Sequence, residues 1–435
     1  MKNKINIFLI ISIVVFLFAN PLTSSTSLEN INPINIIQIN SQSALAPKII
    51  EILDKINESL LRDILQDLVD IGPRSTGTYG CEKAAEYIYE RFVSSGLQTK
   101  YKPWESRGSK GHNHYYISKN IEGTLNGTNK DWDEVIVFNA HYDTVRKTVG
   151  ANDDGSGTAA VLAAAYVLGQ YEFNRTLKFV TFSGEEIGLR GSRSYAKEFY
   201  EKDINLMVEF NADMIGYATT YETAHKLRLS ITEDAHWIAD ITDLINDGYN
   251  LNFNIEHYNR TRDGRGGSDY HEFLQYGYES IAFWEAEHDL NMHKPTDTID
   301  KINFSYLVNM TRFIAGTMAI LGDSPIQKPQ LKIANPKHGR FYSNDRELLK
   351  FKYNRTIFIG NSWISAEIKA GSSPIEKVEF YYDDKLEYTT YQLPYIWWLN
   401  KTSFNFHIIK VIVYDKTGQT STDEIKILYI NKNDD

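Results

Sequence analysis

The chain carries the stretch Glu134-Val-Ile-Val-Phe-Asn-Ala-His-Tyr-Asp143, in which a short apolar run passes directly into a histidine and an aspartate. Two similar runs follow, Leu177-Lys-Phe-Val-Thr-Phe-Ser183 before Gly184-Glu-Glu186, and Leu206-Met-Val-Glu-Phe-Asn-Ala212 before Asp213. Short runs of this kind are typical of buried strands. Helical stretches lie between them, the Ala-rich residues 158–168 among them. The alternation predicts an α/β domain with a mostly parallel central sheet covered by helices.

Further segments fit the same layout. Apolar residues recur at helical spacing from Ile49 to Val69 and stop before Gly72-Pro73, which predicts a core-facing helix. Another helix is expected over residues 80–95, ending at Gly96, because glycine readily adopts a left-handed cap. The remaining expected elements are helices over 192–201, 235–246 and 306–321 and a strand over 280–285.

The composition changes after Gly322. The sequence Asp323-Ser-Pro-Ile-Gln-Lys-Pro329 contains two prolines and indicates a linker. Beyond it are only short alternating runs, such as 377–382, 407–414 and 424–430, separated by turn residues. They predict a small all-β antiparallel sandwich of about 100 residues.

The amino terminus predicts export. Two lysines precede an almost uninterrupted apolar run over residues 5–19, a pattern typical of a secretory signal. An uncleaved membrane anchor is the alternative, although the run falls short of the roughly 20 residues that span a bilayer. The expected organisation is a signal peptide at 1–24, a flexible spacer at 25–44, the α/β domain at 45–325 and the sandwich at 331–432.

Composition narrows the possible partners. The formal charge of -10 argues against a nucleic acid partner, which requires clustered Lys and Arg. Cys81 is the single cysteine, so no internal disulfide can form. We expect a secreted protein, or one at the extracytoplasmic cell surface, with no integral membrane domain once the signal is removed.

Acidic and histidine residues follow the predicted strands directly. The carboxyl ends of parallel strands share one edge of a sheet, where ligands bind in open α/β sheets. Zinc accepts both imidazole and carboxylate ligands. The residues expected to bind zinc at this edge are His141, Asp153, Glu186, Asp213 and His293.

Two zinc ions about 3.5–4 Å apart need a shared ligand, and a carboxylate can bridge where an imidazole cannot. We expect Asp153 to be that bridge. Glu185 precedes Glu186 by one residue and should point away from the metals, which makes it the candidate general base for a bridging hydroxide. Asp143 is suited to accept a hydrogen bond from the other imidazole nitrogen of His141 and to fix its tautomer.

These residues lie in motifs that resemble the co-catalytic zinc aminopeptidase family, which includes bacterial leucyl aminopeptidases and glutamate carboxypeptidase. The resemblance extends over roughly residues 60–322. The motifs are His141-Tyr-Asp143-Thr, Gly150-Ala-Asn-Asp153-Asp-Gly-Ser-Gly157, Ser183-Gly-Glu-Glu186-Ile-Gly-Leu-Arg-Gly-Ser192, Asn211-Ala-Asp213 and His293-Lys-Pro-Thr-Asp-Thr298.

The resemblance implies a zinc exopeptidase-like fold, a phosphorylase/hydrolase-like sandwich of helices about the sheet. It also implies how the ligands are shared. His141 and Asp213 would hold one zinc, Glu186 and His293 the other, and Asp153 both.

The stretch Gly267-Ser-Asp-Tyr-His-Glu-Phe273 resembles the family's Ser-Asp-His-x-x-Phe motif. Tyr270 stands at the family's usual His position, so neither it nor His271 is assigned a catalytic role. Asp269 and Asp297 either orient the site or cap local turns. Ser156 is expected to cap the helix that follows it.

The carboxyl-terminal segment resembles bacterial immunoglobulin-like modules of secreted hydrolases, through Val378-Glu-Phe-Tyr-Tyr382, Pro394-Tyr-Ile-Trp397 and Val413-Tyr-Asp-Lys-Thr-Gly418. The resemblance implies attachment to a surface or polymer, or a spacing and stabilising role.

The expected function is that of a secreted metallo-aminopeptidase that uses two zinc ions to remove amino-terminal residues from peptides. Glutaminyl cyclase or carboxypeptidase activity on the same scaffold is the alternative. Cyclases of similar fold bind a single zinc, and the carboxypeptidases carry an inserted lid for which the roughly 55 residues between Asp213 and Ser268 leave little room. A binding protein on an inactive peptidase fold is a third possibility, but such proteins lose metal ligands, and all five are present.

Overall fold

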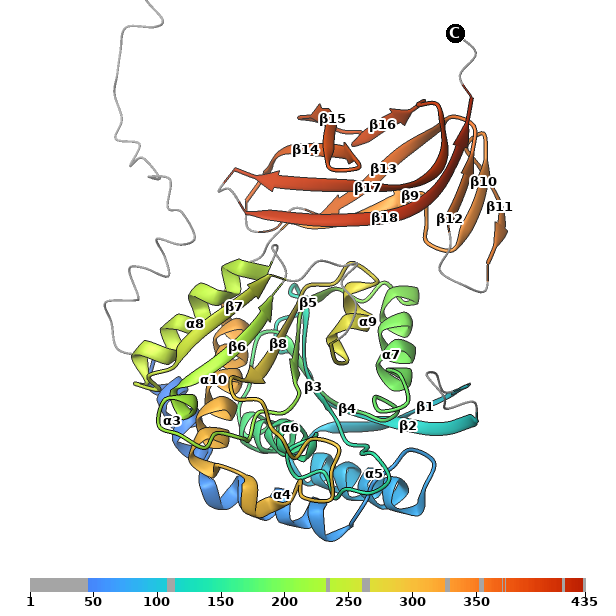
Figure 1. Ribbon diagram of the computed structural model, residues 1–435. Coiled ribbons are helices and arrows are strands. Elements are labelled where there is room, and N and C mark those ends of the chain that lie inside the picture. Colours follow the sequence, from blue (N-terminus) through green and yellow to red (C-terminus); the bar gives the residue numbers. More distant parts are fainter. Residues whose placement is uncertain are drawn as a thin grey trace, which may run out of the picture. The chain divides into compact units, whose positions relative to one another are not determined.

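The computed structural model describes residues 46–107, 114–231, 235–259, 267–324, 329–351, 356–369, 371, 373–416 and 419–432 (Figure 1). The predicted signal peptide (1–24) and spacer (25–44) lie outside the described residues. Within the described chain, helices and strands alternate as far as Asp323, and only strands follow.

An eight-stranded sheet forms the centre of the α/β part, with the order β1-β2-β4-β3-β5-β8-β6-β7. β4, β3, β5 and β8 run parallel in the middle, whereas β2 pairs antiparallel with β1 and β4, and β6 pairs antiparallel with β8. All seven residues of β3 are buried, as expected of a central strand. The strands are β1 (Gln98–Arg107), β2 (Tyr115–Leu125), β3 (Val135–His141), β4 (Thr176–Phe182), β5 (Leu206–Ala212), β6 (Lys226–Ile231), β7 (Asn254–Asn259) and β8 (Ser280–Glu285).

Helices cover both faces of this sheet (Figure 1). α7 (Arg190–Glu201) and α9 (Tyr270–Leu274) pack on one face. The helices of the other face are α3 (Pro47–Lys55), α4 (Glu58–Asp70), α5 (Tyr79–Ser94), α6 (Gly155–Leu168) and α10 (Phe304–Asp323), with α8 (His236–Gly248) against α10. Two short 3-10 helices, η1 (Thr223–His225) and η3 (Ile299–Lys301), lie in loops.

Two helices of this layer form the core behind the sheet. Every residue of α6 except Tyr166 is buried, because its alanines and glycines let it lie close to β3. By length and composition α10 alone among the described helices could cross a membrane, but most of it is buried within the fold.

The predicted fold class is confirmed, with differences in detail. The apolar stripe from Ile49 to Val69 forms two helices rather than one, because Ile56 is extended and Asn57 caps α4. The prediction also lacked β1, β2, β6 and β7. These strands flank the central four, and their exposed or charged residues interrupt the apolar pattern that marks a buried strand.

The carboxyl-terminal part is a β sandwich. A seven-stranded sheet, β11-β10-β12-β18-β17-β14-β15, shares a core with a three-stranded sheet, β16-β13-β9. The expectation of purely antiparallel pairing was wrong, because β12 runs parallel to both β10 and β18. The immunoglobulin-like assignment stays a prediction. The strands are β9 (Gln330–Asn335), β10 (Arg340–Ser343), β11 (Arg346–Lys350), β12 (Thr356–Ile359), β13 (Ser362–Lys369), β14 (Ile375–Tyr382), β15 (Lys385–Thr390), β16 (Ile396–Leu399), β17 (Ser403–Asp415) and β18 (Thr420–Asn431).

The cap of α4 allows a test of the break between α3 and α4. Oδ1 of Asn57 accepts a hydrogen bond from the backbone N–H of Leu60 at 3.1 Å. Replacing Asn57 by Ala should lower the free energy of unfolding by about 1 kcal/mol, whereas Asn57→Asp should retain most of the stability. Urea unfolding followed by circular dichroism measures both, and equal stability of Asn57→Ala and the parent would contradict the cap.

Candidate metal centre

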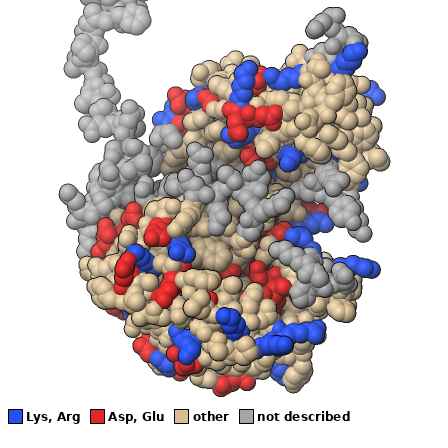
Figure 2. Space-filling view, viewed as in Figure 1, with Lys and Arg blue, Asp and Glu red and all other residues tan. Residues whose placement is uncertain are grey.

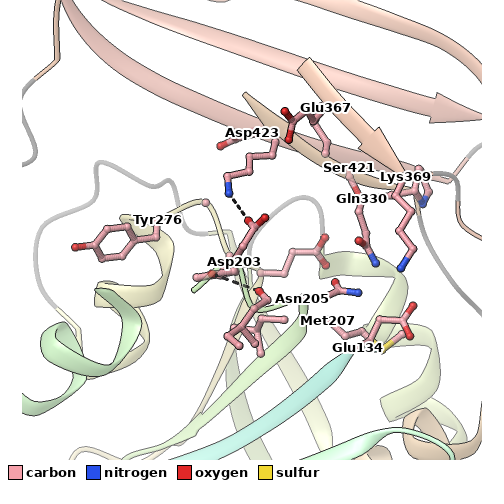
Figure 3. A pocket seen from close by; sticks show the side chains of 18 of the residues that line it. Glu134, Asp203, Asn205, Met207, Tyr276, Gln330, Glu367, Lys369, Ser421 and Asp423 are labelled. Atoms are coloured by element: carbon pink, nitrogen blue, oxygen red, sulfur yellow. Dashed lines mark hydrogen bonds and ion pairs between the residues drawn. The ribbon is translucent and has the colours of Figure 1, made fainter. Parts of the chain in front are cut away.

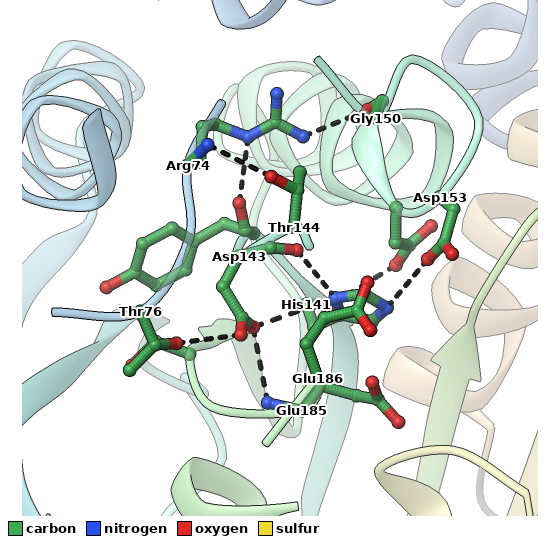
Figure 4. A network of polar contacts seen from close by, with 12 residues as sticks. Arg74, Thr76, His141, Asp143, Thr144, Gly150, Asp153, Glu185 and Glu186 are labelled. Carbon is green, nitrogen blue, oxygen red and sulfur yellow. Dashed lines mark hydrogen bonds and ion pairs between the residues drawn. The ribbon is translucent and has the colours of Figure 1, made fainter. Parts of the chain in front are cut away.

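The candidate metal ligands meet at one edge of the parallel strands. Figure 4 shows His141, Asp153 and Glu186 among them. His141 is the last residue of β3, and Asp213 directly follows β5. Glu186 lies in the loop after β4, Asp153 in the turn before α6, and His293 in the loop after β8. Because β4, β3, β5 and β8 are neighbours, these five residues converge as the strand pattern predicts.

The five residues form two groups that share one member. His141, Asp153 and Asp213 make the first group, and Asp153, Glu186 and His293 make the second. In the first, Nε2 of His141 lies 3.4 Å from Oδ1 of Asp153 and 3.7 Å from Oδ1 of Asp213.

In the second group, Nε2 of His293 lies 3.1 Å from Oδ2 of Asp153 and 3.1 Å from Oε2 of Glu186. The two oxygens of Asp153 therefore face different groups. This is the geometry that a shared carboxylate requires.

His141 is oriented through its other ring nitrogen. Nδ1 lies 3.0 Å from the backbone carbonyl oxygen of Asp143 and 3.7 Å from its carboxylate Oδ1. The expected partner was the carboxylate, but the carbonyl is nearer. The carboxylate accepts hydrogen bonds from Oγ1 of Thr76 at 2.7 Å and from the backbone N–H of Glu185 at 3.2 Å, so Asp143 connects Glu185 to His141 (Figure 4).

The two adjacent glutamates have different surroundings. Oε2 of Glu186 faces His293, while its Oε1 is buried and has no hydrogen bond partner in the described part of the chain. Glu185 belongs to neither ligand group among the described residues. Burial raises the pKa of Glu185 well above its usual value, with Asp213 and Asp269 adding to the rise. Its environment therefore favours holding a proton.

The surroundings of the two histidines favour their protonated, positively charged form. Burial disfavours a charged imidazole at His141, but hydrogen bonds to Asp143, Asp153 and Asp213 raise its pKa well above the usual value. Hydrogen bonds to Asp153 and Glu186 raise the pKa of His293 to about 10. The carboxylates therefore stabilise positive charge at the two positions that a divalent cation would occupy.

Asp297 and Asp269 lie outside both ligand groups. The carboxylate of Asp297 accepts hydrogen bonds from the backbone N–H groups of Asn152 at 2.8 Å and Asp153 at 3.1 Å. Of its two predicted roles, this geometry corresponds to orienting the site. Asp269 is fully buried and makes no cap bond at the start of α9, and burial raises its pKa to about 7.

Sequence reasoning missed the residue that caps α6. The cap is Asp154, whose Oδ1 accepts from the N–H of Gly157 at 2.9 Å, so the assignment to Ser156 was wrong. Asp154 also accepts from the backbone N–H groups of His141 and Met214. Aspartate is a preferred cap residue, so its place before Gly155-Ser-Gly157 was the available signal.

Arg74 was also missed. It is fully buried, and its guanidinium donates to the carbonyl oxygens of Tyr142, Val149 and Gly150 (Figure 4). It thereby holds the loop between His141 and Asp153. No local pattern in the sequence marks it, because its partners are backbone atoms about 70 residues away.

A pocket of about 510 Å³ opens beside the two groups. Met214 and Met292 line it, and they are the chain neighbours of Asp213 and His293. Trp284 from β8 and Tyr258 from β7 add aromatic surface.

A second cavity of about 430 Å³ is remote from these residues (Figure 3). It is lined by Leu206 and Met207 at the start of β5 and by residues of β9, β13 and β18. The ligand Asp213 follows the opposite end of β5, about 20 Å away at the usual rise of a strand. This cavity is therefore separate from the two ligand groups.

The donor set suits zinc. Two imidazoles and three carboxylates supply nitrogen and oxygen ligands, with one carboxylate facing both groups. Oε1 of Glu186 is buried and has no hydrogen-bond partner among the described residues, so it is available as a further metal ligand at the second group. Acidic and basic side chains are interspersed over the visible face of the described chain (Figure 2), so the acidic character of the centre is local.

Comparison with known proteins finds similarity in the α/β part of the chain. Residues 120–318 match the model of peptidase family M28. The chain is 30% identical to aminopeptidase YwaD of Bacillus subtilis over 195 residues, which are 43% of this chain and 41% of that relative. The match thus spans about two fifths of the relative's length.

Solved structures share the fold. The chain superposes on BSAP, a zinc aminopeptidase from Bacillus subtilis, with a TM-score of 0.54 at 19% identity, covering 62% of this chain and 96% of that one. The glutaminyl cyclase of Fimbriiglobus ruber gives a TM-score of 0.52 at 18% identity, covering 61% and 95%. At these identities the likeness establishes the fold alone.

The raised histidine pKa values predict proton release on metal binding. The raised pKa values favour protonated imidazoles at neutral pH in the metal-free protein, whereas a metal ligand must be neutral. The apparent zinc affinity should therefore rise with pH from 7 towards about 10, the pKa of His293. Titration calorimetry in buffers of different ionisation enthalpy measures the protons released. Zinc affinity that stays constant over this range would contradict the raised values; His225→Gln, outside both groups, is the control.

Proposed function

We propose that the protein is a metallo-aminopeptidase that uses two zinc ions to hydrolyse the amino-terminal peptide bond of its substrates. The observation that carries this proposal is the carboxylate of Asp153, whose two oxygens face the two separate groups. A single ion would need only one of these groups. The match to peptidase family M28 and the similarity to an aminopeptidase support the same activity.

Each group would hold one ion. His141 and Asp213 would bind the first, Glu186 and His293 the second, and Asp153 both. Bound zinc would polarise the scissile carbonyl and lower the pKa of a bound water. The carbonyl oxygen of Asp143 would keep Nε2 of His141 directed at the metal by binding Nδ1, and Asp297 would hold the turn that presents Asp153.

Glu185 is proposed as the general base. Its backbone N–H is held by Asp143, so the carboxyl group is placed beside the metal ligands. Burial favours its protonated form, which suits a group that must accept a proton from water and then deliver it to the leaving amine. Neighbouring cations would lower this pKa enough for the carboxylate to act first as a base.

The charge around the centre favours the amino end of a peptide. Asp213 at the first group and Glu287 and Asp289 in the adjoining pocket provide negative charge, which attracts a free ammonium and repels a terminal carboxylate. The pocket lined by Met214, Met292 and Trp284 would receive the side chain of the first residue. A carboxypeptidase would need a predominantly cationic pocket, whereas Arg228 is here outnumbered by Glu285, Glu287 and Asp289.

Glutaminyl cyclase activity is the second candidate, because one structural neighbour is such an enzyme. A cyclase of this fold is expected to bind a single zinc ion. The pairing of Asp153 with both His141 and His293 favours two ions and hence the peptidase.

We further propose export and an attachment role for the carboxyl-terminal sandwich. The apolar run at residues 5–19 supports the first. For the second, the half-exposed rings of Trp363 and Trp398, on neighbouring strands with centroids 4.7 Å apart, offer an aromatic surface for a polymer.

Removing the base should stop turnover without removing the metal. Glu185→Ala should lower kcat by about two to four orders of magnitude, because the proton transfer loses its acceptor. Zinc content by atomic emission and the thermal unfolding midpoint should stay at the parent values. Glu201→Gln, on the exposed end of α7, is the matched control. Unchanged kcat in Glu185→Ala would remove this residue from the mechanism.

Product analysis tests which bond is cleaved. Incubation with a mixed peptide library should release free amino-terminal residues, and amino-terminal acetylation should block release because it removes the ammonium group. A chelator should abolish the activity and added zinc restore it. Mass spectrometry distinguishes the candidates: loss of carboxyl-terminal residues would indicate a carboxypeptidase, and loss of ammonia from glutaminyl peptides a cyclase.

A further inference from the structure

Asn152 occupies a position that the proposed mechanism does not use. It precedes Asp153 in the turn between β3 and α6, and its side chain is completely buried. Its amide contacts two other segments that carry metal ligands. One follows β5 and contains Asp213, and the other follows β8 and contains His293.

The acceptor side of the amide holds the segment after β5. Oδ1 of Asn152 accepts a hydrogen bond from the backbone N–H of Gly216 at 3.0 Å. Gly216 is three residues beyond Asp213 and has little room beside it, since an added Cβ would lie 2.9 Å from this same Oδ1. The contact therefore fixes both the chain path after Asp213 and the orientation of the amide.

The donor side holds the segment after β8. Nδ2 of Asn152 donates to Oδ2 of Asp289 at 3.0 Å and to the two oxygens of Glu285 at 3.0 and 3.1 Å. Glu285 is the last residue of β8, and Asp289 lies in the loop that leads to His293. Both acidic residues are buried, so their oxygen atoms need hydrogen-bond donors from within the protein.

No other residue type fits these contacts as well. The position requires an acceptor towards a backbone N–H and donors towards two carboxylates, which a short amide provides. Aspartate would keep the acceptor but would bring a third buried carboxylate against Glu285 and Asp289. Alanine would leave both acids without this donor.

The two ligand groups depend on the hydrogen bonds of Asn152 to different degrees. In the first group, His141 belongs to β3 and Asp213 is held by a backbone hydrogen bond to Phe283 of β8. In the second, His293 lies on a loop, its side chain is 49% exposed, and its φ is 61°. Packing therefore does little to position His293, and the loop contacts at Asp289 and Asp297 must do so.

We propose that Asn152 is a positioning residue that holds the His293 loop against the turn of Asp153 and thereby maintains the second metal position. This inference rests on the proposed binding of two zinc ions. It adds that different residues hold the ligands of the two metal positions in place. Asn152 acts mainly on the group of Glu186 and His293.

The test is a zinc titration of the metal-free full chain, by calorimetry and by chelator competition. Asn152→Ala and Asn152→Asp should each weaken the second zinc about 10- to 100-fold, as loss of a group supporting a metal ligand does, and the first much less, because Asp213 is also held by the backbone bond to Phe283. Glu186→Ala defines the titration of a protein that has lost the second position. Cobalt substitution gives an independent readout, because the visible absorption of the Asn152 variants should approach that of Glu186→Ala.

Two further variants separate positioning from general loss of stability. Asn246→Ala removes a similar amide that binds the backbone of Phe253 away from the metal groups, and it should leave both affinities unchanged. Asp289→Ala removes the contact from the loop side and should weaken the same zinc. Adding it to Asn152→Ala should cause little further loss.

The outcomes distinguish this inference from the proposed function. A parent protein that binds no zinc, or only one ion, would refute the two-zinc function itself. A parent that binds two, with Asn152→Ala and Asp289→Ala either unaffected or weakened equally at both positions, would overturn the role of Asn152 alone.

Discussion

Repulsion between buried carboxylates is the constraint on which the centre depends. Asp143, Asp153, Glu186 and Asp213 lie within one small region, facing two histidines. Such groups are stable together only if protons or cations offset their charge. The same charge that makes the region costly to fold makes it selective for divalent cations. The cluster of buried carboxylates thus both lowers the stability of the metal-free fold and provides the ligands for a cation.

The sheet allows this arrangement because its centre is rigid. β3 is buried along its whole length, and α6 lies against it with almost no exposed surface. Ligands on strand ends are thus held by the core, whereas those on loops need local polar contacts. Arg74, Asp154 and Asp297 supply these contacts by binding backbone atoms of the turns between the ligands.

The sequence predicted the structure best where a residue pattern corresponds to a single type of structural element. Apolar runs that end in His141, Glu185 and Asp213 predicted the central strands and the edge at which they meet. The supporting residues could not be predicted in the same way, because Arg74 and Asn152 act through distant backbone and side-chain partners. The break at Asn57 and the exchange of Ser156 for Asp154 as a cap show a related limit. Several nearby polar residues could serve as caps, and only the backbone geometry selects one.

The shared carboxylate of Asp153 has a consequence for assembly of the holoprotein. Its two oxygens belong to a single delocalised charge, so a cation bound at one oxygen withdraws electron density from the other. In the proposed two-zinc form the positions would fill in sequence, because the first ion would bind a full anionic ligand and the second a partly neutralised one. At limiting zinc supply such a protein would accumulate in a half-loaded form.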